Sequence, residues 1–224
     1  MSRTTLAPCR GRSQARQGRA RWVMVRLALL AAAVLAPGCS GPDARQPILR
    51  FSDRWSFETG LEGWQPRGLD LELGGGEIAW SIAPSTARAS DGSISLELYL
   101  ENYNDAGKIF IERAIDLEPD TDYDVALRFD LGTQDRGDVN LFVVVAGALA
   151  SSPTSRQEIM ALGQGSTRSG SEEPVWVWVP KKVHTRVHTG ASGRVFVVVG
   201  IWGTWETPAT YYLDDVAVDI SEPG

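Results

Sequence analysis

Short runs of alternating apolar and polar residues fill the chain from Leu69 onward. In the run Ser93–Leu100 every second residue is isoleucine or leucine, which is the period of a half-buried strand. Turn signals such as Asp91-Gly92 and Ser192-Gly193 separate the runs. The pattern predicts the following strands: Leu69–Leu73, Glu77–Ile82, Ser93–Leu100, Lys108–Ile115, Tyr123–Leu131, Val139–Ala146, Gln157–Leu162, Val175–Val179, Val183–His188, Arg194–Ile201 and Tyr211–Ile220.

Strands at this spacing, with no amphipathic helix of useful length, predict an all-β sandwich or barrel. Phe142–Val145 and Val195–Val199 are apolar at every position, so we expect them to be central strands covered on both faces. Gly163–Glu173 contains no apolar residue and predicts a mobile loop. We find no internal repeat and expect a single domain.

The N-terminal segment carries a different signal. Leu27–Ala36 is an apolar run that follows Arg26; a membrane-spanning helix needs about 20 apolar residues, so this run is typical of the h-region of a signal peptide. The sequence LAPGC, ending at Cys39, resembles a lipobox, which implies cleavage before Cys39 and lipidation of its thiol. The alternative is an ordinary signal peptide with an incidental cysteine.

The predicted organisation is a signal peptide over 1–38, a polar tether over 39–50 and a β-sandwich domain over 51–224. Translation from Met24 gives a more compact signal of the ordinary lipoprotein kind, so Met24 is an alternative start. We expect an exported protein, anchored to a bacterial membrane through lipid on Cys39. Because Ser40 rather than aspartate follows Cys39, the outer membrane is favoured if the organism is Gram-negative.

Charge divides the chain in the same place. The first 39 residues hold seven arginines and no acidic residue, which leaves 15 basic against 28 acidic residues, a formal charge of about −13, in the remainder. An acidic domain repels phosphate backbones and argues against nucleic acid, whereas it suits divalent cations and neutral partners such as sugars. The two cysteines, Cys9 and Cys39, both precede the domain, so the domain forms no disulfide.

Four segments in a fixed order resemble the carbohydrate-binding modules of the CenC type, families 4, 9 and 22. Phe57–Trp64 (FETGLEGW) is similar to the opening motif of these modules, Ala89–Leu96 (ASDGSISL) to a strand motif, Leu117–Tyr123 (LEPDTDY) to a turn and strand, and Tyr211–Val218 (YYLDDVAV) to the closing motif. The resemblance implies a galactose-binding-like, two-sheet antiparallel jelly-roll β-sandwich whose first and last strands are adjacent.

The same resemblance implies a structural calcium ion where the two chain ends meet. On the matched positions Glu58 and Asp214 supply carboxylates, and the loop around Asp91 completes the shell. Calcium takes six to eight oxygen ligands, so carboxylates from both ends of the domain would hold the sandwich together. The alternative is that Asp214 belongs to a merely charged strand edge.

Tryptophans supply the candidate binding residues. Sugar sites need flat aromatic faces and polar neighbours for hydroxyl groups. Trp176 and Trp178 share one face of a predicted strand, and Trp202, Trp205 and Glu206 lie in a glycine-containing loop before the last strand. The alternative is that most of these rings pack between the sheets, as we expect for Trp64.

We see no catalytic motif of the kinds that place a nucleophile, a metal or a phosphate. His184 and His188 lie about 13 Å apart along a predicted strand, too far for one metal ion, and Glu172-Glu173 falls in the predicted loop. The preferred reading is noncatalytic glycan binding by a lipid-anchored module. The alternatives are a structural or protein-interaction lipoprotein without sugar affinity, since fold does not fix function, and a jelly-roll polysaccharide-active enzyme.

Overall fold

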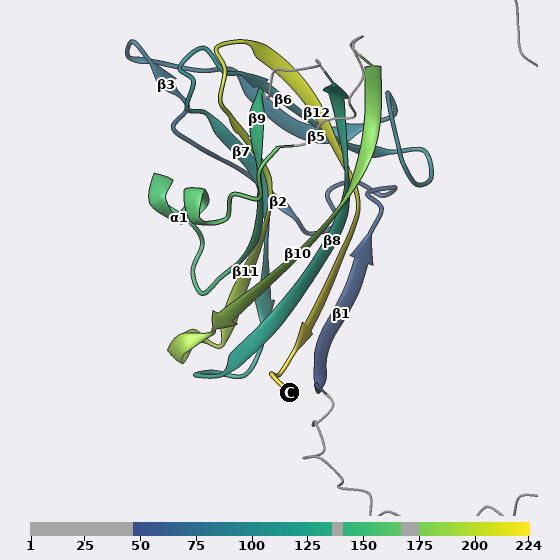
Figure 1. Ribbon diagram of the computed structural model, residues 1–224, viewed down its shortest axis with the longest axis vertical. Helices are drawn as coiled ribbons and strands as arrows, with labels where there is room; N and C mark the ends of the chain where they lie inside the picture. The colour runs from purple at the N-terminus through teal and green to yellow at the C-terminus, as the bar shows by residue number, and fades with distance from the viewer. Residues whose placement is uncertain (1–46, 136–140, 167–174) are drawn as a thin grey trace, which may run out of the picture. The chain divides into compact units, whose positions relative to one another are not determined.

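A computed structural model of the chain describes residues 47–135, 141–166 and 175–224. The predicted signal peptide, Cys39 and most of the predicted tether lie outside these residues. The described part is built from two antiparallel sheets that pack face to face (Figure 1). The predicted all-β, two-sheet antiparallel sandwich is therefore confirmed.

The larger sheet has six strands. Five follow one another in the order β10 (Val175–His188), β8 (Asp122–Asp135), β12 (Pro208–Ser221), β6 (Ser95–Glu101) and β5 (Trp80–Ser85). The sixth, β1 (Leu49–Trp55), pairs with the second half of β12. The chain therefore brings its first and last strands side by side, as the resemblance implied (Figure 1).

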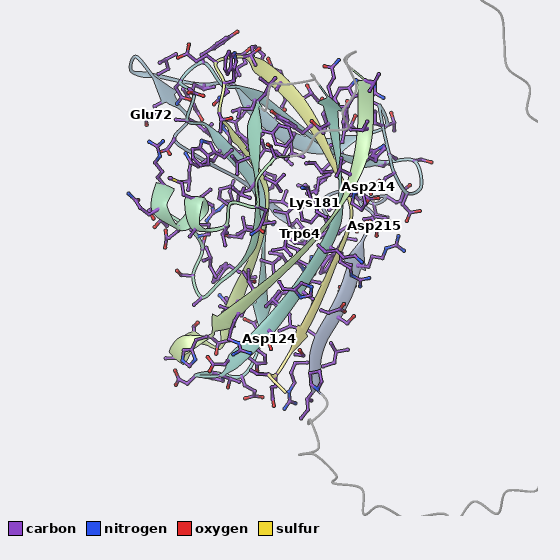
Figure 2. All side chains as sticks on the ribbon, in the orientation of Figure 1. Trp64, Glu72, Asp124, Lys181, Asp214 and Asp215 are labelled. Atoms are coloured by element: carbon purple, nitrogen blue, oxygen red, sulfur yellow. The ribbon has the colours of Figure 1, made fainter. Side chains whose placement is uncertain are left out.

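The smaller sheet has four strands in the order β2 (Gln65–Leu69), β7 (Lys108–Asp116), β11 (Arg194–Gly203) and β9 (Phe142–Leu149). A short hairpin joins β3 (Glu72–Leu73) to β4 (Gly76–Glu77), and a single turn of 3-10 helix spans Gly190–Ser192. The core lies between the sheets, where the longer central strands bury residues at alternate positions; Trp64, labelled in Figure 2, is fully buried there as predicted.

One predicted strand is wrong. Gln157–Leu162 was expected to be extended, but Arg156–Ala161 forms the α-helix α1. The Ser155 side chain accepts a hydrogen bond from the Glu158 backbone N–H, and the Glu158 side chain accepts one from the Ser155 backbone N–H. This reciprocal pair is a capping box, which favours a helix start, and Ile159 is the residue that the helix buries.

Helix α1 also explains a second difference. Phe142–Val145 was expected to lie in a central strand, but β9 is the edge strand of its sheet. Its outward residue Val145 is nevertheless fully buried, because Ile159 and Leu162 cover it. Val195–Val199 does lie in a central strand, β11, as expected.

The remaining differences concern boundaries. Val175–Val179 and Val183–His188 form one continuous strand through Pro180, which is compatible with a sheet because β10 lies at the edge, where a missing N–H can face away from the ladder. The predicted strand Leu69–Leu73 is interrupted, because β2 ends at Leu69 and β3 begins at Glu72, and the predicted strand Glu77–Ile82 is divided between β4 and β5. The strand β1 and most of β2 were not predicted, and β1 begins at Leu49, two residues before the predicted domain boundary.

Candidate functional site

The outer face of the six-stranded sheet gathers aromatic side chains from separate strands. Trp178 of β10 lies opposite Gly132 of β8, and Gly132 lies opposite Tyr212 of β12. Tyr212 in turn lies opposite Glu97 of β6, and Trp176 precedes Trp178 by two residues on the same face. We call these residues the tryptophan face: Trp176, Trp178, Gly132, Tyr212 and Glu97.

The three rings of the tryptophan face are in contact. The ring centroids of Trp176 and Tyr212 are 5.3 Å apart with an interplanar angle of 67°, and those of Trp178 and Tyr212 are 6.4 Å apart at 55°. Such inclined arrangements are favoured for aromatic pairs. Tyr212 is buried at the base, whereas both tryptophans are half-buried and present part of their surface to solvent.

Polar groups border the rings. The Tyr212 hydroxyl donates to Glu97 Oε2 at 3.2 Å, and the Ser85 hydroxyl donates to the same oxygen at 3.0 Å. The guanidinium carbon of Arg88 lies 4.3 Å from the centre of the Trp176 ring, a cation–π contact. Burial, with the Glu97 carboxylate nearby, raises the pKa of Tyr212, so its hydroxyl stays protonated and available as a donor at neutral pH.

The other predicted binding residues lie elsewhere. Trp202 was expected in a loop but belongs to β11, where it packs on the outside of the smaller sheet against the cluster that contains Phe110 and Val198. Its buried indole N–H has no hydrogen-bond partner among the residues that the structure describes. Trp205 does lie in the turn before β12; it is 57% exposed and lines a hollow of about 310 Å³ with Asp105 and Glu206.

A larger hollow, of about 570 Å³, lies beside the β3–β4 hairpin. Its lining includes Asp70, Glu72, Glu77 and the half-buried Trp80. Asp70 is held by the ammonium group of Lys108, which donates to Asp70 Oδ2 at 2.5 Å. Lys108 is fully buried, and burial lowers its pKa. Three acidic residues, three glycines and two leucines line this hollow besides Trp80, and Trp80 packs against the core.

The residues of the predicted calcium site meet at one loop, Ser90–Ile94. Asp214 Oδ2 accepts hydrogen bonds from the backbone N–H of Ser90 at 2.8 Å and of Asp91 at 3.0 Å, and from the Ser90 hydroxyl at 3.2 Å. Glu58 Oε1 accepts from the N–H of Ser93 at 2.7 Å and of Ile94 at 2.8 Å. Carboxylates from the beginning and end of the domain thus hold the same loop (Asp214 is labelled in Figure 2).

These residues do not fit a calcium shell in this arrangement. The loop turns N–H groups, rather than carbonyl oxygens, toward both carboxylates, and calcium requires oxygen ligands. The Asp91 carboxylate pairs with Arg54 at 2.9 Å. Within residues 47–135, 141–166 and 175–224, no three histidine, cysteine or acidic side chains group as metal ligands. Calcium therefore stays a prediction from the resemblance, with its own test below.

Burial of the Asp214 carboxylate raises its pKa, an effect that the N–H donors of Ser90, Asp91 and Asp215 partly oppose. Glu58 is exposed, and the N–H groups of Ile94 and Ser93 lower its pKa. In the described residues we find no helix long and apolar enough to cross a membrane.

Several residues of the tryptophan face were not identified from the sequence. Tyr212 was noted only as part of the closing motif, and Gly132 and Glu97 were not singled out. The bordering residue Arg88 was not singled out either. Each lies on a different strand or loop from the tryptophans, so only the pairing register brings them together. His184 and His188, which the spacing along the strand argues against as a metal pair, are both exposed.

The chain is similar in fold to several proteins of known structure. No protein-family model and no curated protein matches the chain. A family 61 carbohydrate-binding module in complex with β-1,4-galactotriose is similar at 16% identity and a TM-score of 0.38, over 73% of this chain and 92% of that one. The K1 cleaved adhesin domain of Lys-gingipain from Porphyromonas gingivalis W83 is similar at 15% identity and a TM-score of 0.46, over 78% and 100%. A family 22 xylan-binding domain from Paenibacillus barcinonensis is similar at 14% identity and a TM-score of 0.36, over 80% and 97%.

Proposed function

We propose that the domain is a noncatalytic glycan-binding module and that the tryptophan face is its binding site. The observation that supports this most directly is the convergence of Trp176, Trp178 and Tyr212 on one partly exposed surface. Partly exposed aromatic faces accept the C–H side of a pyranose ring, and nearby polar groups serve its hydroxyl groups.

In the proposed complex the sugar rings stack on Trp176 and Trp178, and Glu97 and Arg88 form hydrogen bonds with hydroxyl groups. Glu97 is suited to accept because its Oε2 already receives two hydroxyl donors that fix its position. The rings stand on strands rather than on loops, so their geometry is set before the ligand arrives. A preformed site lowers the entropy lost on binding.

The proposal is tested by a glycan array followed by titration calorimetry with the best ligand, on the chain from Ser40 onward. We expect Trp176→Ala and Trp178→Ala each to weaken binding by about 1–3 kcal/mol, the range of a truncated aromatic contact residue. Trp205→Ala is the matched control, because Trp205 is an exposed tryptophan of the same domain outside the tryptophan face. Loss of binding in Trp205→Ala alone would move the site to the turn before β12.

Absence of binding to every polysaccharide on the array, with and without calcium, would instead favour the structural or protein-interaction lipoprotein. Both functions use the same face, because a protein partner would also contact Trp176 and Trp178. The array therefore separates them, and mutation of the tryptophans alone does not.

The membrane anchor is a separate part of the proposal. We propose that Cys39 is lipidated after cleavage of the signal peptide; support comes from the LAPGC sequence that follows the apolar run. More than one acyl chain gives durable anchoring. The test is detergent phase partition of the exported protein: the natural chain is expected in the detergent phase and Cys39→Ser in the aqueous phase. Equal partition of both proteins would reject lipidation.

A further inference from the structure

A row of basic residues crosses the six-stranded sheet close to the tryptophan face. Lys182 of β10 lies opposite Arg128 of β8, Arg128 lies opposite Ala217 of β12, and Ala217 lies opposite Arg54 of β1. Pairing partners project from the same face of a sheet, so the three basic side chains lie on the outer face. The small Ala217 side chain stands between the two arginines.

The structure has a hollow of about 370 Å³ at this row. Lys182, Arg128, Arg54 and Ala217 line it, together with the neighbouring Lys181 and the carboxylates Asp130 and Asp215. Ala217 has a short side chain and lies between the long side chains of Arg128 and Arg54, which explains why the surface is hollowed there. The hollow is thus a recess that gathers four basic side chains and two carboxylates, an excess of basic groups, in a domain whose formal charge is about −13.

The three basic residues of the row differ in their ion pairs. Arg54 pairs with Asp91 and Asp215, and Arg128 pairs with Asp219 at 3.1 Å. Within the part of the chain that the structure describes, Lys182 has no such pair, and its side chain is exposed. Its ammonium group can therefore meet an incoming anion without first breaking an internal bond, whereas the arginine pairs hold the walls in place.

The recess lies on the same face of β10 as the aromatic rings. On β10 the outer face presents Trp176, Trp178, Pro180 and Lys182 at successive alternate positions. Lys182 lies four positions after Trp178 on the strand, a distance of about 13 Å. A short run of linked sugars covers this distance. A second cation, Arg88, lies over Trp176 at the other end of the rings. The rings therefore have basic groups at both ends.

We propose that the ligand of the tryptophan face is an acidic glycan, one whose sugars carry carboxylates of the uronic acid kind. This rests on the proposed function. Neutral rings of the chain stack on Trp176 and Trp178, while a carboxylate further along enters the recess and binds Lys182 and Arg128. Hydrogen bonds between a charged donor and a carboxylate are stronger than those of neutral groups, so the recess selects acidic over neutral sugars.

The test compares acidic polysaccharides with their carboxyl-reduced forms, which keep the sugar backbone and lose the charge. A panel of polygalacturonate, alginate and glucuronoxylan, each in both forms, is titrated into the chain from Ser40. We expect the best acidic polymer to bind about tenfold more tightly than its reduced form, in line with one added charge-assisted bond. Raising the salt concentration is expected to narrow this difference.

Lys182→Gln is the decisive variant because it breaks no ion pair within the described residues. It should remove most of the preference for the acidic form and leave the affinity for the reduced form unchanged. Arg194→Gln is the control, since Arg194 is an exposed cation of the smaller sheet, paired with Asp116 at 2.8 Å. Thermal unfolding of each variant confirms that it is folded.

The outcomes separate the two proposals. If acidic and reduced polymers bind equally well and Trp178→Ala weakens the binding of both, the proposal of an acidic ligand is overturned and glycan binding is retained. A preference for acidic polymers that Lys182→Gln leaves intact would overturn the role of the recess. If no polymer of the panel binds but the glycan array gives a neutral ligand, the acidic ligand is overturned and glycan binding is retained. If the array is also empty, both proposals are rejected.

Discussion

The indole ring of Trp178 lies directly across Gly132. A Cβ atom at Gly132 would come within 3.1 Å of two ring carbons of Trp178 and within 2.9 Å of the Tyr212 Cβ. Both distances are shorter than ordinary van der Waals contact. The missing side chain on β8 is therefore what lets rings from β10 and β12 approach each other over the strand that separates them.

Replacing Gly132 tests this relationship. We expect Gly132→Ala to push the Trp178 ring outward, to weaken glycan binding and to destabilise the fold by about 1–2 kcal/mol, as small overpacking changes do. The measurements are titration calorimetry and urea unfolding. Gly76→Ala is the matched control, because its Cβ would meet only the Leu73 carbonyl oxygen, at 3.7 Å. Unchanged binding in Gly132→Ala would show that the position of Trp178 does not matter.

The second prediction concerns the buried carboxylate of Asp214. Asp214→Ala leaves the N–H groups of Ser90 and Asp91 without their acceptor, and we expect a loss of about 3 kcal/mol in the free energy of unfolding. Asp116→Ala should stay within about 0.5 kcal/mol, because its ion pair with Arg194 is exposed. Similar losses in both variants would contradict the view that Asp214 anchors the loop.

The pH dependence of Asp214 has a definite sign. Its pKa is raised in the folded protein, so between the unfolded and folded pKa values the native state binds more protons than the unfolded state. Stability from this group is fully present below the unfolded pKa and is lost as pH rises through the folded pKa. Asp214→Asn cannot ionise, so the stability of the natural protein relative to this variant should fall as pH rises from about 4 toward neutrality. A relative stability that grows with pH would contradict the raised pKa.

Calcium gives a further test of the Ser90–Ile94 loop. Because the carboxylates of Glu58 and Asp214 face N–H donors, we expect the Tm in EDTA and in millimolar calcium to agree within about 1 °C. An ion present at 100 times its Kd would add about 2.7 kcal/mol and raise the Tm by several degrees. Such a rise, lost in Glu58→Gln, would establish the calcium site that the resemblance implies.

The alternating pattern was sufficient to predict the sandwich, because strand period depends on local sequence and Leu96, Leu98 and Leu100 show it clearly. It failed at Arg156–Ala161, where a capping box and one buried isoleucine form a helix too short for periodicity to reveal. It also missed β1, whose exposed positions hold several polar residues and which is held by pairing with β12.

The tryptophan face could be predicted only in part. Trp176 and Trp178 share a face by their spacing alone, and this was foreseen. That Gly132 and Tyr212 lie beside them depends on long-range register between β10, β8 and β12, which no local pattern encodes. Trp202 was placed in a glycine-containing loop, but β11 continues through Trp202 and Gly203.

The most direct test of the central claim is NMR of the indole N–H groups during titration with the best glycan from the array. If the tryptophan face binds sugar, the signals of Trp176 and Trp178 shift in proportion to occupancy. Those of the buried Trp64 and of Trp205, in the turn before β12, stay in place. Shifts confined to Trp205, or binding with no change at Trp176 and Trp178, would contradict a glycan site on the outer face of the six-stranded sheet.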